Sequence, residues 1–288
     1  MTPKAILVAI GGGEGSEAAL RTALAVGKLF DSYVEVLHVR ADSNEAIPIM
    51  AEGLSGAVVQ ELIDSLEAQA ERRAKAAEVL FKKCCVDERL AITTPDSPPP
   101  SGKLSARLKV VTGRPDDVVG RAGRLFDLIV VERPPEEEDS RYPLVLEAAL
   151  FDSGRPILLA PSSAPATVGK RIVVIWNNTK ESAEALAAVL PFGQQAESLQ
   201  VLTVKDGITA DPAEVKSYLA LHDITAEAVT LEPDHRPLGE QLLKEAEARD
   251  ADLLVMGAYG HSRLREMVLG GVTRSVVGEA AVPVLMAH

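Results

Sequence analysis

Short apolar runs alternate with amphipathic segments along most of this chain. The runs within Lys4–Leu20 and Ala251–Met256 are rich in valine, isoleucine and leucine, which is typical of strands buried on both faces of a parallel sheet. The segments between such runs place apolar residues three and four positions apart, as an amphipathic helix does. This alternation predicts right-handed crossovers and a doubly wound α/β fold.

The same order of segments occurs twice. "KAILVAIGGGEGSEAAL" (Lys4–Leu20) resembles "KRIVVIWNNTKESAEAL" (Lys170–Leu186), and later segments match in the same order, namely Tyr33–Val39 with Ser198–Val204, Gly113–Pro115 with His235–Pro237, Phe126–Arg133 with Ala251–Ala258, and Arg155–Pro161 with Val282–His288. Such ordered self-similarity indicates a duplication. We therefore predict two tandem domains, 1–165 and 166–288, with about five parallel strands each, joined by the Pro/Ser/Ala-rich segment Ala160–Gly169.

The first copy carries an insertion. From Ser55 to Lys83 the apolar positions repeat with a helical period, which predicts a long amphipathic helix followed by a loop over Thr94–Gly102. The second copy has one short helix there. Its start is marked by Asp211 and Pro212, a cap residue and a proline at the first helical position.

Composition narrows the class of protein. The 288 residues are 47% hydrophobic and 25% charged, with a net charge of −12, which argues against a nucleic-acid partner because such proteins usually carry a basic patch. The apolar runs are too short for a signal peptide or a membrane span. The two cysteines, Cys84 and Cys85, have no metal-ligand spacing and are expected to be reduced thiols at a helix end. We expect a cytoplasmic protein with no membrane partner.

One stretch near the end concentrates glycines. "VMGAYGHSRLREMVLGG" (Val255–Gly271) runs from a predicted strand into the predicted helix Val272–Ala280. Ligands of parallel α/β sheets bind beyond the carboxyl ends of strands, and a helix N-terminus attracts phosphate. Glycines also serve tight turns and close helix–sheet packing. The spacing alone matches neither the Walker nor the dinucleotide pattern, so both interpretations stay open at this point.

The spacing does resemble a known family. The sequence G-x2-G-x9-G, here Gly257, Gly260 and Gly270, is similar to the nucleotide-binding signature of universal stress proteins, and the "PVL" of their closing strand is found at Pro283–Leu285. The resemblance covers essentially the whole chain as two copies. It implies a five-stranded, Rossmann-like fold of the adenine nucleotide alpha hydrolase type, a role in the stress response and, in some members, ATP binding.

The resemblance also implies site residues in the second copy. The phosphate positions are Gly257, Gly260, Gly270, Gly271 and Thr273, and the adenosine positions are Asn177 and Val204. Two of them depart from the family pattern, since Gly271 stands where Ser or Thr is usual and Asn177 replaces an Asp. In the first copy, Glu132 aligns with Gly257 and "RPPEEEDSRYP" (Arg133–Pro143) replaces the glycine loop. Like-charge repulsion makes that loop a poor phosphate cradle, so we expect a structural or partner-binding first domain.

The sequence assembles no catalytic residue set and no metal site. The expected function is a stress-response module that binds ATP, with Mg²⁺ if ATP is bound, or another adenine nucleotide in the second domain, with at most weak ATP hydrolysis. The alternative is a scaffold that binds no nucleotide and acts through protein partners. We also expect an intrachain pseudo-dimer, because Ile157–Ala160 and Val284–Ala287 would each expose a sheet edge unless they pair. A further homodimer is left open.

Overall fold

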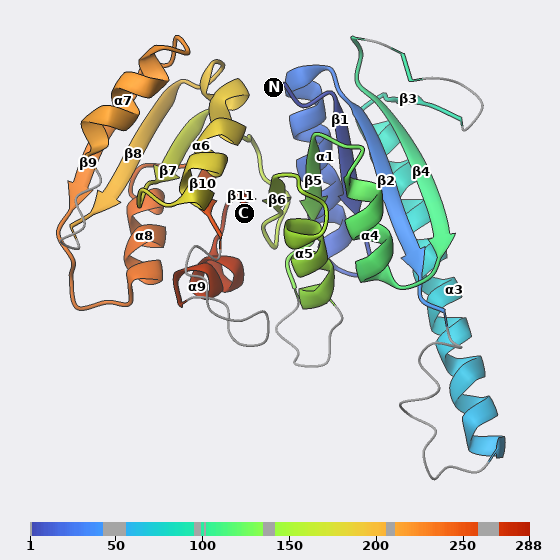
Figure 1. Ribbon diagram of the computed structural model, residues 1–288. Helices are drawn as coiled ribbons and strands as arrows, with labels where there is room; N and C mark the ends of the chain where they lie inside the picture. The colour runs from blue at the N-terminus through green and yellow to red at the C-terminus, as the bar shows by residue number, and fades with distance from the viewer. Residues whose placement is uncertain are drawn as a thin grey trace.

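The architecture is taken from a computed structural model of the chain. The structure describes residues 2–42, 56–94, 99–100, 102–134, 142–205, 211–258 and 271–288. Two lobes lie side by side, with the amino-terminal lobe carrying one long helix that extends past the end of its sheet (Figure 1).

Each lobe alternates strands with helices in the predicted order. The elements of the first are β1 (Ala5–Ala9), α1 (Gly15–Phe30), β2 (Tyr33–Arg40), α3 (Gly56–Asp87), β3 (Ala91–Ile92), β4 (Ser105–Thr112), α4 (Pro115–Gly123), β5 (Leu128–Val131), α5 (Tyr142–Phe151) and β6 (Ile157–Leu159). Those of the second are β7 (Arg171–Ile175), α6 (Lys180–Gly193), β8 (Ser198–Val204), α7 (Pro212–Ala220), β9 (Glu227–Leu231), α8 (Leu238–Glu247), β10 (Leu253–Gly257), α9 (Gly271–Glu279) and β11 (Val284–Ala287).

The strands of both lobes join into one sheet. Within the described residues it has 11 strands in the order β3-β4-β2-β1-β5-β6-β11-β10-β7-β8-β9. The order β4-β2-β1-β5-β6 of the first lobe is repeated as β9-β8-β7-β10-β11 in the second, and all pairs within a lobe are parallel. The chain therefore contains tandem domains of one doubly wound fold, as the sequence predicts.

The two domains meet through their last strands. β6 and β11 pair antiparallel, with Leu285 opposite Leu158, so the predicted pairing of these two edges is confirmed. Phe30 at the end of α1 and Phe192 in the last turn of α6 also meet, with ring centroids 4.9 Å apart and nearly perpendicular planes. Leu158 and Leu285 are equivalent residues of the two copies, and their pairing across antiparallel strands indicates a pseudo-twofold axis at the junction.

Apolar residues cover both faces of the sheet. One buried cluster packs α1, α3, α6 and α7 on one face, and a second packs α4, α5, α8 and α9 on the other. Each cluster includes strand residues from both domains, such as Leu158 with Leu285 in the first and Ile157 with Val284 in the second. The junction is therefore a continuous core and not a hinge between separate cores.

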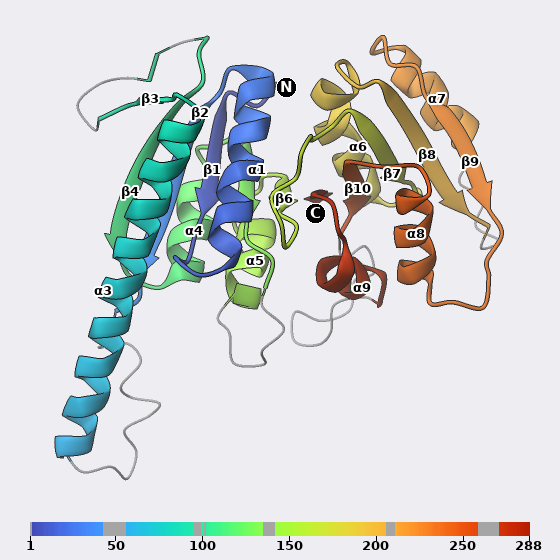
Figure 2. The same cartoon turned by 180° about the vertical axis from the view of Figure 1, so that it is seen from behind.

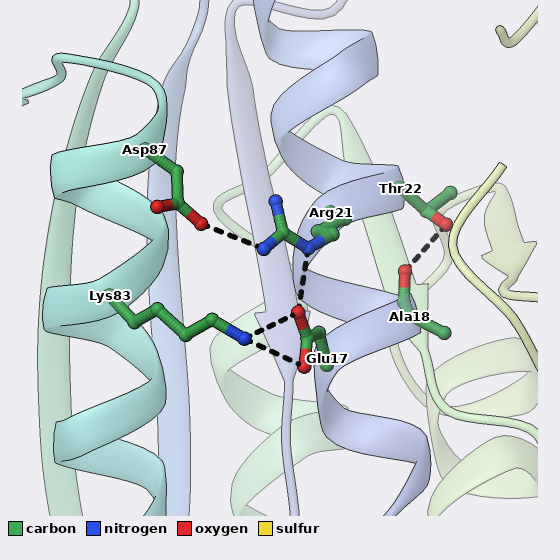
Figure 3. Close-up of polar contacts among 6 residues, drawn as sticks. All are labelled: Glu17, Ala18, Arg21, Thr22, Lys83 and Asp87. Atoms are coloured by element: carbon green, nitrogen blue, oxygen red, sulfur yellow. Dashed lines mark hydrogen bonds and ion pairs between the residues drawn. The ribbon is translucent and has the colours of Figure 1, made fainter. Parts of the chain in front are cut away.

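The long helix α3 packs against α1. Its buried residues, Ala77, Phe81, Cys84 and Cys85, lie in its carboxyl-terminal part, and both cysteines are free thiols. Two ion pairs flank this contact, Arg21 with Asp87 at 2.8 Å and Lys83 with Glu17 at 3.1 Å (Figure 3). Figure 2 shows α3 beside α1 and, beyond it, the part that projects below the sheet.

The predicted elements agree with the structure apart from their ends. The helix predicted over Ser55–Lys83 runs from Gly56 to Asp87, and α9 begins at Gly271, one residue earlier than predicted. The short strand β3 was not predicted, since its two residues are too few to show a period. Among the described residues, no helix is both long enough and apolar enough to cross a membrane.

Candidate functional site

The strand order of the second domain reverses at β7. β7 is central, β8 and β9 lie on one side of it, and β10 and β11 lie on the other. Open α/β sheets bind ligands outside the carboxyl ends of the two strands at such a switch point. Here those strands are β7 and β10, which are paired in register, Val174 opposite Val255.

Asn177 lies in the exposed turn after β7. Its Oδ1 accepts a hydrogen bond from Thr179 Oγ1 at 2.9 Å and a longer one from Thr179 N at 3.4 Å. Thr179 caps α6, and its side chain and that of Ser182 form a reciprocal capping box. Asn177 therefore helps to shape the start of α6. Val204, the last residue of β8, is half-buried at the neighbouring strand end.

Gly257 ends β10 directly against the first turn of α6. A Cβ atom at this position would lie 2.5 Å from Ser182 N and 2.6 Å from the Glu181 carbonyl carbon. Any side chain would therefore displace the helix, because real Cβ atoms do not approach backbone so closely. Helix packing is thus sufficient to explain why residue 257 is glycine. That Gly257 also contacts a phosphate stays a prediction.

The phosphate positions on α9 differ in exposure. Gly271, the first residue of the helix, is exposed, and no atom of the described chain lies within 4 Å of a Cβ built there. Thr273 is buried. Among the described residues, then, nothing crowds this helix start, and a helix N-terminus attracts anions. Gly260 and Gly270 lie outside the described residues, so the structure brings together only part of the predicted set.

The equivalent position in the first domain is filled by a carboxylate. Glu132 follows β5 as Gly257 ends β10, and it is only 6% exposed. Its Oε1 accepts hydrogen bonds from Gly11 N at 2.8 Å and from the hydroxyl of Ser16 in the first turn of α1. The side chain thus occupies the place beside a helix start where an anionic ligand would otherwise bind.

Helix α3 closes the same place from outside. Gly12, with a φ of +76°, lies so close to the Arg73 carbonyl that a side chain would collide with it. His38 of β2 is buried nearby and bonds the Ile10 carbonyl through Nδ1 at 2.9 Å. Burial lowers the pKa of His38, and the charges of Arg73 and Arg40 lower it further, against the opposing effect of the Ile10 hydrogen bond.

Sequence reasoning identified Glu132 as a replacement for a glycine but missed its role. The available signal was an acid aligned with a glycine, next to a second glycine-rich turn in the same copy. The Gly11 and Ser16 partners are more than 110 positions away in sequence, so the contact depends on β1 and β5 being neighbours. Among the described residues, no group of three or more histidine, cysteine or acidic side chains could hold a metal ion.

The carboxyl-terminal part of the chain matches the sequence model of the universal stress protein family over residues 178–288. The second domain is therefore similar to this family over almost its whole length. The match begins one residue after Asn177 and includes the other predicted site positions. The first domain, which lies outside it, shares the fold of the second.

Two characterised relatives match over short segments. A universal stress protein of Synechocystis sp. is 44% identical over 46 residues, which is 16% of this chain and 16% of the relative. A second, from Methanocaldococcus jannaschii, is 38% identical over 47 residues, 16% of this chain and 29% of the relative. The matches therefore span less than a third of either relative.

The whole chain resembles a solved two-domain structure. A universal stress protein from Archaeoglobus fulgidus superposes with a TM-score of 0.70, at 18% sequence identity, and the alignment covers 100% of this chain and 99% of that one. The tandem fold is therefore shared from end to end, although identity at this level concerns fold alone.

Proposed function

We propose that this tandem universal stress protein binds an adenine nucleotide, ATP foremost, in its second domain and not in its first. The observation that carries the proposal is the contrast at the two equivalent strand ends. In the first domain, Glu132 satisfies Gly11 N and the Ser16 hydroxyl, while in the second, no side chain extends from Gly257. One universal stress protein structure is of a complex with cAMP, an adenine nucleotide.

The available groups fit such a ligand. The helix start at Gly271 offers backbone N–H groups and the positive end of the α9 dipole to phosphate. Asn177 and Val204, at the ends of β7 and β8, would lie beside the adenosine. A bound triphosphate would carry Mg²⁺, which requires oxygen ligands that the phosphates themselves supply.

The test is titration calorimetry with ATP on the intact chain. Gly260→Glu should abolish binding, because it adds bulk and negative charge to the glycine motif. The matched control is Gly13→Glu, which makes the same change in the glycine-rich turn of the first domain at an exposed position with no neighbour within 4 Å. It should leave the affinity unchanged. Equal loss in both variants would contradict a site confined to the second domain.

A gain-of-affinity variant tests the same site. Gly271→Ser adds the hydroxyl usual in the family, and no group of the described residues stands against a Cβ atom at this position. One additional hydrogen bond to a phosphate should tighten ATP binding by about tenfold. Gly278→Ser, at another uncrowded glycine of α9, should have no effect. A Gly271→Ser affinity equal to that of the unaltered chain would place the phosphates elsewhere.

The second candidate is a scaffold that binds no nucleotide. It is favoured by the packing of Gly257 against α6, which requires glycine without a ligand. It is also favoured by Asn177, whose Oδ1 is already engaged by Thr179. Mass spectrometry of material released by acid from the purified protein separates the two, because a scaffold releases no adenine nucleotide and shows no heat with ATP.

A further inference from the structure

The side chain of Arg133 reaches from the first domain into the second. It directly follows Glu132, and its Nη1 donates a hydrogen bond to the Val277 carbonyl at 2.7 Å, while Nη2 donates to the Ala280 carbonyl. Val277 is in the last turn of α9, and Ala280 directly follows the helix. The first domain thus holds the far end of the helix whose start carries Gly271 and Thr273.

The chemistry of this contact suits a helix end. The last carbonyls of a helix lack partners within it and carry a partial negative charge, which a cation nearby stabilises. A guanidinium presents several donors in a fixed plane and can bond two carbonyls at once. Arg133 is half-buried, and burial lowers its pKa, so the two carbonyls replace part of the hydrogen bonding that water would supply.

Among the described residues, the position equivalent to Arg133 makes no such contact in the opposite direction. The residue equivalent to Arg133 in the second domain is Ala258, whose side chain has no donor. At the end of α5, the equivalent of α9, Phe151 instead packs edge-on against the His288 ring at 4.7 Å. The pseudo-twofold symmetry is therefore broken at this position, since Arg133 bonds carbonyls at the end of α9 whereas Ala258 has no donor to offer the end of α5.

The backbone that carries Arg133 is held in place by contacts within the first domain. The preceding residue, Glu132, is held by Gly11 and Ser16. Val131, before it, ends β5 and accepts a hydrogen bond from Ala160 N at 2.9 Å. Glu132 therefore occupies the strand end of the first domain, and the next residue, Arg133, bonds the end of α9 in the second.

We propose that Arg133 is a positioning residue through which the first domain holds α9 and, with it, the phosphate end of the nucleotide site in the second domain. The effect on nucleotide rests on the proposed function, whereas the hold on α9 does not. Since coupling is reciprocal, a ligand bound at the start of α9 also strengthens the contact at its end.

Hydrogen exchange of α9 amides, measured by mass spectrometry without nucleotide, tests the hold. Arg133→Met removes the donors but keeps an apolar stem, and exchange in α9 should become about five- to thirtyfold faster. Arg133→Lys keeps the charge but has fewer donors, and exchange in α9 should become about two- to fivefold faster. The control is Arg124→Met, whose guanidinium bonds the Asp152 carbonyl just after α5 inside the first domain; it should leave α9 unchanged.

Titration with ATP then tests the consequence. The ATP affinity of Arg133→Met should fall by a factor no larger than the increase in the exchange rate. The variant lowers affinity only by reducing the fraction of molecules in which α9 is formed and can bind. The proposal would be overturned by unchanged exchange in α9 of Arg133→Met. If that variant does not fold, unchanged exchange in Arg133→Lys would overturn it. Faster exchange with unaltered ATP affinity would overturn its nucleotide part. If the unaltered chain binds no ATP, the proposed function fails, while the exchange rates still decide whether Arg133 holds α9.

Discussion

Glu132 and Gly257 occupy equivalent strand ends and make the two domains chemically different there. The Glu132 carboxylate meets a backbone N–H and a hydroxyl beside the start of α1, as a bound anion would. Gly257 allows α6 to approach to backbone contact. This one position thus decides whether a carboxylate of the chain itself occupies the strand end.

The carboxylate should stabilise the first domain. Glu132→Gln keeps one acceptor oxygen but loses the charge that strengthens both hydrogen bonds. We expect a loss of about 1–3 kcal/mol in the free energy of unfolding, measured with urea. Glu14→Gln, an exposed acid in the same turn with no capping hydrogen bond, should change it by less than about 0.5 kcal/mol. Equal effects would show that Glu132 is not a structural anion.

His38 gives the first domain a defined response to acid. Since burial lowers its pKa in the folded protein, the unfolded chain binds the proton at higher pH. Below the ordinary value of about 6.5 the unfolded state therefore holds more protons, and stability falls as the pH falls. His38→Asn keeps a donor for the Ile10 carbonyl but cannot titrate.

Urea unfolding at pH 7.5 and 5.5 checks this expectation. The unaltered chain should lose on the order of 1 kcal/mol more than His38→Asn between these two conditions. Both chains share every other titrating group, so the difference isolates His38. A parallel decrease in the two proteins would mean that this histidine ionises equally in the folded and unfolded states.

At the scale of elements, hydrophobic period predicted most helices and strands but not their contacts. The α3 helix was predicted from its apolar positions, yet only Ala77, Phe81, Cys84 and Cys85 in its later part are buried. The sequence has no local signal for this division, because it depends on where α1 begins beside α3. Likewise, the glycine at 257 was recognised, but the approach of Ser182 was not, since helix and strand come from distant segments.

Burial, and not ion pairing, should hold α3 on α1. Phe81 is 5% exposed within the core cluster, and Phe81→Ala should cost about 3–5 kcal/mol in urea unfolding. Lys83 pairs with Glu17 at the surface (Figure 3), and Lys83→Met should cost less than about 1 kcal/mol. A larger loss for Lys83→Met than for Phe81→Ala would reverse this ranking.

At the scale of the whole molecule, the duplicated sequence predicted a paired sheet because each copy ends in a short apolar strand. An edge of this kind needs a partner for its N–H and C=O groups, and the other copy is always near. The interdomain bond of Arg133 could not be found in this way. It breaks the symmetry of the two copies, and its acceptors are backbone carbonyls, which the sequence does not distinguish.

The junction makes a prediction about the separated second half, residues 166–288. Without β6, strand β11 would expose an apolar edge over Val284–Ala287, and a second copy of β11 can pair antiparallel as β6 does. The half should therefore form dimers or larger assemblies at micromolar concentration, measured by analytical ultracentrifugation. Leu285→Lys places a charge on that edge, which blocks strand addition, and should shift the half toward monomer. A monomeric half as stable as the intact chain would show that the β6–β11 pair contributes little to folding. Assembly that is reversed by Leu285→Lys would identify this edge as the contact between copies.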